Sequence, residues 1–300
     1  MSTAIFFDQF GEADVLRVGD EDVPAPGSGE VLVANRAIGV NPADAKVLAG
    51  AFGRDRPLPG VLGFEAAGVV EAVGPDVDGL AVGDEVLWHG TGAQRARAVV
   101  PAANVLAKPA NVPFEQAAVL PVAAATAFSA LVQAGVSDGD TVLVHGASGG
   151  VGSAAVQIAR ALGARVVGTA SEANHDYLRT LGAEPVVYGD GLVEAVRAVS
   201  PDSPVTAVVD LVGTPETVAQ TTELLEDASR AVTIVSSDAS RAAGIADKVD
   251  QKGALAEVLA LAEGERLHLE IAESLPLDRA ADAVRLVQQG HTRGKVVLTA

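Results

Sequence analysis

Residues 145–154 read HGASGGVGSA. The spacing Gly146-x-x-Gly149-x-x-Gly152 is typical of a loop that brings backbone N–H groups against a dinucleotide pyrophosphate. Such a loop lies between the first strand and the first helix of a βαβ unit. The flanking runs TVLVHG and RVVGTA predict the two strands, and the segment between them has apolar residues at helical spacing. The stretch therefore favours a parallel α/β fold that binds a dinucleotide.

The same stretch also matches Gly-x-Ser-x-Gly centred on Ser148, the nucleophile elbow of a serine hydrolase. Asp210, followed by His268 and His291, supplies the order Ser, Asp, His that this interpretation needs. A purely structural glycine turn is a third interpretation. We favour the dinucleotide loop, because only that loop requires the third glycine of the spacing, and keep the other two as alternatives.

The strand pattern divides the chain into two parts. In the first hundred residues short β-rich runs alternate with Pro, Gly and Asp clusters, which predicts a mostly antiparallel β domain. From about residue 115 strands alternate with helices, which predicts a parallel sheet. Its strands are expected at 141–146, 165–170, 184–189, 205–213 and 230–237. The final run, GKVVLTA, is a strand that could return to the first domain.

The composition excludes several kinds of chemistry. The formal net charge is −18, so we expect neither nucleic acid nor an acidic membrane as a partner. The chain has no cysteine, which excludes disulfides, thiolate zinc ligands and a cysteine nucleophile. The first residues lack a signal pattern, so we expect a cytoplasmic protein. The apolar run 117–132 is shorter than the roughly 20 residues of a membrane span and predicts a buried helix.

Five motifs follow one another along nearly the whole chain. They are PADAK (42–46), GFEAAGVVEAVG (63–74), GDEVL (83–87), the run from LVHGASGG to RTLGA (143–183) and TRGKVVL (292–298). Together they resemble the zinc-free quinone oxidoreductase branch of the medium-chain dehydrogenase/reductase superfamily. The resemblance implies an α/β fold: a GroES-like catalytic domain at 1–116 and 270–300, and a doubly wound Rossmann cofactor domain at 117–269. It also implies a homodimer joined through the edge of the Rossmann sheet.

The resemblance implies hydride transfer from NADPH to a quinone or an α,β-unsaturated carbonyl. Zinc-dependent relatives carry Gly-His-Glu where this chain has Gly63-Phe64-Glu65, and their cysteine ligands are absent, so we expect no metal. Without a Lewis acid, an acceptor that is already electrophilic is favoured. A different class of function stays open, because tyrosines of relatives are missing here: an NADPH-binding sensor or structural protein with little turnover. A serine hydrolase using Ser148 is a remote alternative.

Family likeness also indicates the residues of the catalytic site. The segment GVNPADAKVLAG carries over Asn41, Asp44 and Lys46 as catalytic residues. A lysine ammonium near the acceptor oxygen would stabilise the enolate or hydroquinone anion that forms; the alternative is a solvated surface lysine. The predicted substrate cleft comprises Phe52, Phe64 and Gln94. Because Phe52 stands where some relatives have tyrosine, we expect the final proton to come from water.

The cofactor contacts are predicted partly from the loop and partly from the resemblance. We favour NADPH over NADH, because hydroxyls rather than a carboxylate follow the second strand of the βαβ unit. The basic residue that relatives place shortly afterwards is missing. The predicted contacts are Asn41, Thr126, Gly146, Ser148, Gly149, Gly150, Val151, Gly152, Thr169, Ser171, Asn174, Tyr188, Val212, Ser236 and Lys295.

Overall fold

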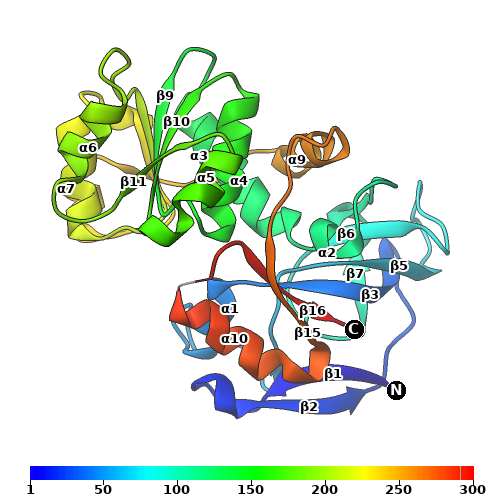
Figure 1. Cartoon of the computed structure of the whole chain (residues 1–300). Helices are drawn as coiled ribbons and strands as arrows, with labels where there is room; N and C mark the ends of the chain where they lie inside the picture. Colours follow the sequence, from blue (N-terminus) through cyan, green and yellow to red (C-terminus); the bar gives the residue numbers. More distant parts are fainter. Residues whose placement is uncertain (291) are drawn as a thin grey trace. The chain divides into compact units, whose positions relative to one another are not determined.

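The computed structural model describes residues 1–290 and 292–300 (Figure 1). The chain forms two compact units: unit 1 comprises Met1–Val122 and Glu270–Ala300, and unit 2 comprises Ala123–Leu269. The sequence pattern places the first boundary at 116/117 instead. Residues 117–122 belong to unit 1, where the Val122 N–H donates to the Glu65 carboxylate.

Unit 2 contains a parallel sheet in the order β11-β10-β9-β12-β13-β14. This is the doubly wound order 3-2-1-4-5-6, so the predicted Rossmann fold is confirmed. The chain reverses direction across the sheet between β9 and β12, and ligands of such folds bind beyond the carboxyl ends of the strands at this point. The strands are β9 (Thr141–His145), β10 (Arg165–Ala170), β11 (Glu184–Val187), β12 (Ala207–Asp210), β13 (Ala231–Thr233) and β14 (Ala246–Asp247).

Helices cover both faces of this sheet. Helices α3, α4 and α5 lie on one face, and α6 and α7 on the other (Figure 1). The sheet is apolar on both faces, and its core includes Leu143, Val167 and Val208. The helices are α3 (Ala125–Gln133), α4 (Gly150–Ala161), α5 (His175–Thr180), α6 (Leu192–Val199), α7 (Pro215–Leu224), α8 (Asp238–Ala242) and α9 (Ala254–Glu263).

Unit 1 is built from two mainly antiparallel sheets. The described residues form a large sheet in the order β15-β16-β3-β5-β6-β8, with β7 also paired to β3, and a small sheet β2-β1-β4. The last strand pairs antiparallel with β3, so the chain end returns to the first domain. The strands are β1 (Ser2–Phe7), β2 (Leu16–Glu21), β3 (Glu30–Val40), β4 (Gly60–Val61), β5 (Glu65–Val73), β6 (Glu85–His89), β7 (Arg97–Pro101), β8 (Val105–Ala107), β15 (Ile271–Pro276) and β16 (Lys295–Thr299).

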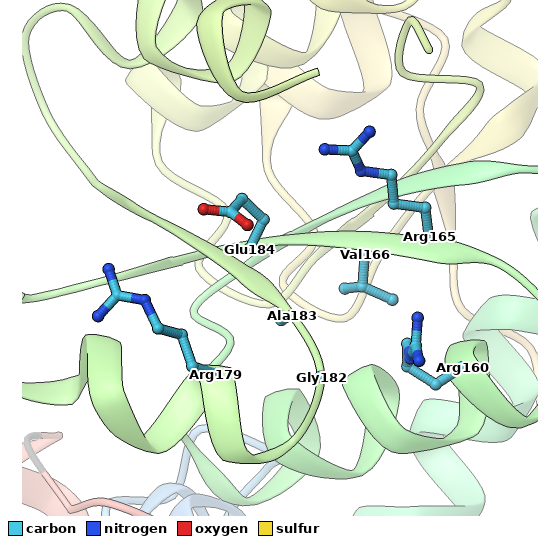
Figure 2. A pocket seen from close by; sticks show the side chains of 7 residues that line it. All are labelled: Arg160, Arg165, Val166, Arg179, Gly182, Ala183 and Glu184. Carbon is cyan, nitrogen blue, oxygen red and sulfur yellow. The ribbon is translucent and has the colours of Figure 1, made fainter. Parts of the chain in front are cut away.

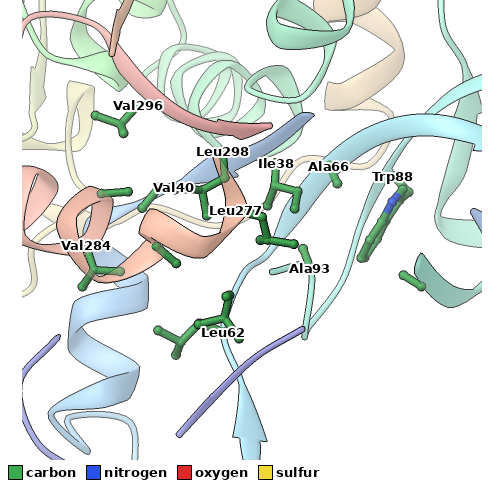
Figure 3. Packing of buried hydrophobic residues seen from close by; sticks show 14 of the residues in the cluster. Ile38, Val40, Leu62, Ala66, Trp88, Ala93, Leu277, Val284, Val296 and Leu298 are labelled. Atoms are coloured by element: carbon green, nitrogen blue, oxygen red, sulfur yellow. The ribbon is translucent and has the colours of Figure 1, made fainter. Parts of the chain in front are cut away.

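The core of unit 1 joins both ends of the chain. Helix α10 (Ala280–Gln289) packs Val284 into the same cluster as Ile38 and Leu298, which face one another across β3 and β16 (Figure 3). Trp88 is fully buried, and its indole N–H donates to Asn35 Oδ1 at 2.9 Å. Two further helices, α1 (Pro42–Leu48) and α2 (Phe114–Ala117), complete the unit.

The helical run Phe114–Gln133 comprises α2, a π-turn at Leu120–Ala124 and α3. It is the one described helix whose length and composition would suffice to cross a membrane, and 61% of its apolar window is buried inside the protein. The buried helix expected at 117–132 therefore agrees with the structure. The π-turn forms where Pro121 lacks an N–H and the Val122 N–H donates outside the helix.

Candidate functional site

The glycine loop of unit 2 lies between β9, which ends at His145, and α4, which begins at Gly150. Gly146 has a φ of +73°, in the left-handed region that glycine adopts without strain. Its N–H donates to Thr169 Oγ1 at 3.0 Å, and the Ala147 N–H donates to the Thr169 carbonyl oxygen at 3.0 Å. Strand β10 therefore holds the start of the loop at two points.

Gly152 and Gly149 have different structural roles in the loop. A Cβ on Gly152 would lie 2.2 Å from the Gly146 carbonyl oxygen, so only glycine lets the first turn of α4 approach the loop. A Cβ on Gly149 would meet only that same oxygen, at 3.7 Å, so the space beside Gly149 is open in unit 2. The first N–H groups of α4 have no intrahelical partner and lie at the positive end of the helix dipole. The loop therefore fits a pyrophosphate.

Three predicted cofactor residues lie together beside the loop. Asn174 Nδ2 donates to Ser171 Oγ at 3.2 Å and to Ser148 Oγ at 3.4 Å. Ser148 belongs to the glycine loop, and Ser171 follows the last residue of β10. All three side chains are half-buried and uncharged, whereas Glu172 is exposed. The arrangement offers hydroxyl and amide groups next to the anion-binding end of α4.

The other predicted cofactor residues of unit 2 differ in their exposure. Thr169 is buried and holds Gly146, so we correct its predicted role from phosphate contact to support of the loop. Val212 is 42% exposed and flanks Gly146, and Tyr188 is 59% exposed after β11. Ser236 donates to Asp247, away from the loop cluster, and Thr126 is half-buried in α3.

Asp210 fixes the turn beside the glycine loop. It is buried at the end of β12, and its Oδ1 accepts the N–H groups of Val212 and Gly213, both at 2.9 Å. Its Oδ2 accepts the Thr217 hydroxyl at 2.9 Å. Because Val212 flanks the loop, Asp210 controls the shape of one wall of the loop site.

His145 is completely buried at the end of β9, in register with Asp210 on β12. Its Nε2 lies 3.4 Å from the Thr221 hydroxyl, and its Nδ1 has no hydrogen-bond partner among residues 1–290 and 292–300. Burial lowers the pKa of His145, and the charge of Asp210 acts in the opposite direction. The ring is therefore neutral near neutral pH.

The groups of the serine hydrolase interpretation are not brought together in the described part of the chain. Ser148 Oγ is bonded to Asn174, and Asp210 is occupied as described above. The backbone N–H of His268 donates to Gln157 on the outer part of α4. His291 lies outside the described residues.

Unit 1 contains a second polar cluster, centred on Glu65, which is fully buried at the start of β5. Its Oε1 accepts Asn41 Nδ2 at 2.8 Å and lies 3.1 Å from Lys295 Nζ, while its Oε2 accepts the Val122 N–H at 2.7 Å. Lys295 also donates to Asn41 Oδ1. Both ends of the Asn41 amide are thus fixed. We correct the predicted role of Lys295 from cofactor contact to support of Asn41, because its side chain is buried.

Asp44 caps helix α1 from within this cluster. Its Oδ2 accepts the Asn41 N–H at 2.9 Å, and its Oδ1 accepts the Gly63 N–H at 2.7 Å. Burial raises the pKa of Asp44 to about 7, although both N–H groups and the Lys295 charge act to lower it. The Asp44 side chain has no exposed surface and holds the backbone at Asn41 and Gly63. We therefore correct its predicted role from a catalytic residue to a positioning residue.

The surroundings of Glu65 do not fit a zinc ion. The atoms that contact its carboxylate are an amide nitrogen, an ammonium and a backbone N–H, all hydrogen-bond donors. Zinc needs nitrogen, sulfur or oxygen lone pairs instead. The cation beside Glu65 in this chain is Lys295.

The predicted cleft residues of unit 1 have varied environments. Lys46 is exposed on α1, on the face opposite buried Asp44, and has no partner among the described residues. Phe52 is 60% exposed, and Phe64 packs partly against the core. Gln94 is buried, and both of its amide atoms have no partner in the described residues; its place in the substrate cleft stays a prediction.

Sequence patterns do not single out Glu65 or His145 as site residues, and they single out Asp210 only for the serine hydrolase interpretation. A usable signal exists: His145 and Asp210 are ionisable residues inside runs that predict strands buried on both faces, and Glu65 lies at the start of a largely apolar β-rich run. A charge in such a position requires a partner. The partners, however, are distant in the sequence, so the pattern alone does not name them.

Comparisons with known proteins agree with this architecture. Residues 27–110 match the alcohol dehydrogenase GroES-like domain, and residues 150–269 match the zinc-binding dehydrogenase family. The structure of a quinone oxidoreductase from Coxiella burnetii is 31% identical with a TM-score of 0.87, covering 100% of this chain and 99% of that one. The Escherichia coli quinone oxidoreductase complexed with NADPH is 26% identical with a TM-score of 0.87, covering 99% and 100%.

Similarity also extends to a much larger protein. The polyketide synthase GfsB of Streptomyces halstedii is 39% identical over 292 residues, which is 90% of this chain and 5% of the synthase. This chain therefore spans only a small part of that relative. A Rossmann unit with a glycine loop and a GroES-like unit in one chain are the two domains that the matched dehydrogenase families describe. The chain belongs to the medium-chain dehydrogenase/reductase superfamily, in its quinone oxidoreductase branch.

The free energy of unfolding should depend on pH through His145, which is buried and neutral in the folded chain. The unfolded chain takes up a proton at this residue below its ordinary pKa of 6.5, whereas the folded chain does not until a lower pH. The contribution of His145 to the free energy of unfolding should therefore fall as the pH decreases below 6.5, by at most about 1.4 kcal/mol per pH unit, whereas buried Asp44, whose pKa is raised to about 7, contributes a rise over the same range. Urea denaturation of the wild type and His145→Gln from pH 7.5 to 5.5 separates the two contributions. Relative to His145→Gln, the wild type should lose stability as the pH falls; an identical pH dependence in both proteins would contradict the assignment.

The Glu65–Lys295 pair predicts a distinctive double-mutant result. Lys295→Met leaves a buried carboxylate without its cation and should cost about 3–5 kcal/mol in the free energy of unfolding. Adding Glu65→Gln removes the unbalanced charge, so the double variant should be more stable than Lys295→Met alone. Denaturant titration of the three variants checks this. If the double variant is the less stable, the pair is not coupled as described.

Proposed function

We propose that this protein is an NADPH-dependent, zinc-independent oxidoreductase that transfers hydride to a quinone or an α,β-unsaturated carbonyl. The observation that carries the proposal is the glycine loop of unit 2, with its open space beside Gly149 and the cluster of Ser148, Ser171 and Asn174 next to it. This combination fits a dinucleotide that carries negative charge at both the pyrophosphate and the ribose end.

The side chains of Ser148, Ser171 and Asn174 favour NADPH over NADH. NAD enzymes usually place a carboxylate after the second strand to accept the ribose hydroxyls. Here the groups that face one another are the hydroxyls of Ser148 and Ser171 and the amide of Asn174, which can donate to a 2′-phosphate. The complex of the E. coli relative with NADPH supports the same choice.

When bound, NADPH supplies the hydride. The chain's own groups bind and orient the reactants. Backbone N–H groups at the start of α4 hold the pyrophosphate, while the ion pair of Glu65 and Lys295 fixes the Asn41 amide, which family likeness assigns to the nicotinamide end. Lys46, with its unpaired ammonium, stabilises negative charge that develops on the acceptor oxygen. With Phe52 in place of tyrosine, water delivers the final proton.

The chemistry of unit 1 supports the proposed zinc independence. The chain has no cysteine, and the Glu65 carboxylate is already balanced by Lys295. An acceptor that needs no Lewis acid suits this site, because quinones and conjugated carbonyls are electrophilic in themselves.

We also propose a cytoplasmic homodimer. The edges of the Rossmann sheet are β11 and β14, and either could pair with a second copy. Light scattering on the purified protein distinguishes a dimer from a monomer.

The test of the function is oxidation of NADPH, followed at 340 nm, with a para-quinone and an α,β-unsaturated ketone offered separately and each product identified. We expect consumption with at least one acceptor, unchanged by EDTA. Lys46→Met should lower kcat at least about tenfold, because it removes a cation from the developing anion. Lys252→Met, an exposed lysine of unit 2, makes the same charge change and should retain the activity.

Three results would contradict parts of the proposal. NADPH binding without consumption of either acceptor would favour the sensor or structural alternative. Loss of activity in EDTA, restored by added zinc, would contradict the metal-independent mechanism. Equal activity of Lys46→Met and Lys252→Met would return Lys46 to the role of a solvated surface residue.

A further inference from the structure

A pocket of about 320 Å³ lies at the amino ends of β10 and β11 in unit 2 (Figure 2). The glycine loop follows the carboxyl end of β9, which is parallel to β10. The pocket therefore lies at the opposite end of the strands from the glycine loop. Its lining residues are Arg160, Arg165, Val166, Arg179, Gly182, Ala183 and Glu184. None of them belongs to the proposed oxidoreductase site.

The pocket arises from a short repeat in the sequence. Residues 160–165 read RALGAR and residues 179–184 read RTLGAE, and each segment runs from the last turn of a helix through a glycine turn into a strand. Gly163 and Gly182 both have positive φ, +92° and +88°. The two helix–turn–strand units are neighbours because β10 pairs with β11. The repeat therefore places Arg160 and Arg179 in the lining of one pocket.

Gly182 allows Arg160 to lie across the second turn. A Cβ at Gly182 would be 3.0 Å from Arg160 Nε. The guanidinium of Arg160 makes no hydrogen bond or ion pair within the described residues. In Figure 2 the side chains of Arg160 and Arg165 rise on the same side of the pocket, with Glu184 across from them. The pocket thus holds an unpaired cation in a chain whose formal net charge is −18.

The other two arginines retain free donors. Arg165 donates from Nη2 to the Val199 carbonyl, which leaves its remaining N–H groups free. Arg179 pairs with Asp176, whose carboxylate is almost fully exposed, so a ligand can compete for this guanidinium at little cost. The carboxyl ends of α4 and α5 attract positive charge, which by itself explains why arginines occur at positions 160 and 179. This attraction does not account for Arg165, which begins a strand, or for the shared pocket.

We propose that this pocket binds a small phosphate monoester with a hydroxylated body. The planar guanidinium groups of Arg160 and Arg165, which rise on the same side of the pocket in Figure 2, match the oxygens of a phosphate and bind it through charge-assisted hydrogen bonds. Glu184, which has no ion-pair partner in the described residues, accepts a hydrogen bond from a hydroxyl of the same ligand. The site goes beyond the proposed function and does not depend on it.

Calorimetric titration with glycerol 3-phosphate tests the proposal, on the full chain at constant ionic strength with NADP⁺ present to occupy the loop site. The double variant Arg160→Gln/Arg165→Gln should bind glycerol 3-phosphate at least about tenfold more weakly than the wild type. Arg197→Gln, which removes an exposed arginine on α6 outside the pocket, should bind like the wild type. Inorganic phosphate, which lacks the hydroxylated body, should bind more weakly than glycerol 3-phosphate.

The proposal is overturned if the wild type shows no saturable binding at millimolar concentrations. It is also overturned if both arginine variants bind equally, because the anion would then lie elsewhere. Equal affinity for inorganic phosphate would remove the role of Glu184. Far-UV circular dichroism of the variants establishes that each is folded.

Discussion

The close approach of Gly152 to the carbonyl oxygen of Gly146 is the contact on which the cofactor site depends. A side chain at position 152 would collide with that oxygen at 2.2 Å, so α4 would move away from β9. The approach is fixed from the other side by Thr169, which bonds two successive residues of the loop. Because Thr169 is buried in β10, the strand fixes the position of the glycine loop.

Unit 1 holds the polar amide of Asn41 in a buried position. Burying a charge is costly unless it is paired and hydrogen-bonded. Glu65 and Lys295 neutralise each other, and together they use both ends of the Asn41 amide. The same carboxylate accepts the Val122 N–H and so stabilises the π-turn. One buried ion pair thereby orders a loop, a terminal strand and a helix.

Much of this architecture could be predicted from local patterns. Runs of Val and Ile marked the parallel strands, and GKVVLTA returned to the first domain as expected. Strand ends were less predictable: the run 205–213 forms a strand only at Ala207–Asp210, because Asp210 then bonds the following N–H groups and turns the chain. Thr169 and Lys295 were assigned to the cofactor because polar residues near a site look alike in sequence. Their partners become known only when the fold brings Gly146 and Glu65 to them.

Equilibrium binding of NADPH to the wild type and Gly149→Ala tests the phosphate-binding role of the loop most directly. Among the described residues the added methyl group meets one atom, at 3.7 Å, so the variant should fold like the wild type. It would fill the space assigned to the pyrophosphate and should raise the dissociation constant at least about tenfold, equivalent to 1.4 kcal/mol. Failure of the wild type to bind NADPH, or equal binding by both proteins, would contradict the account.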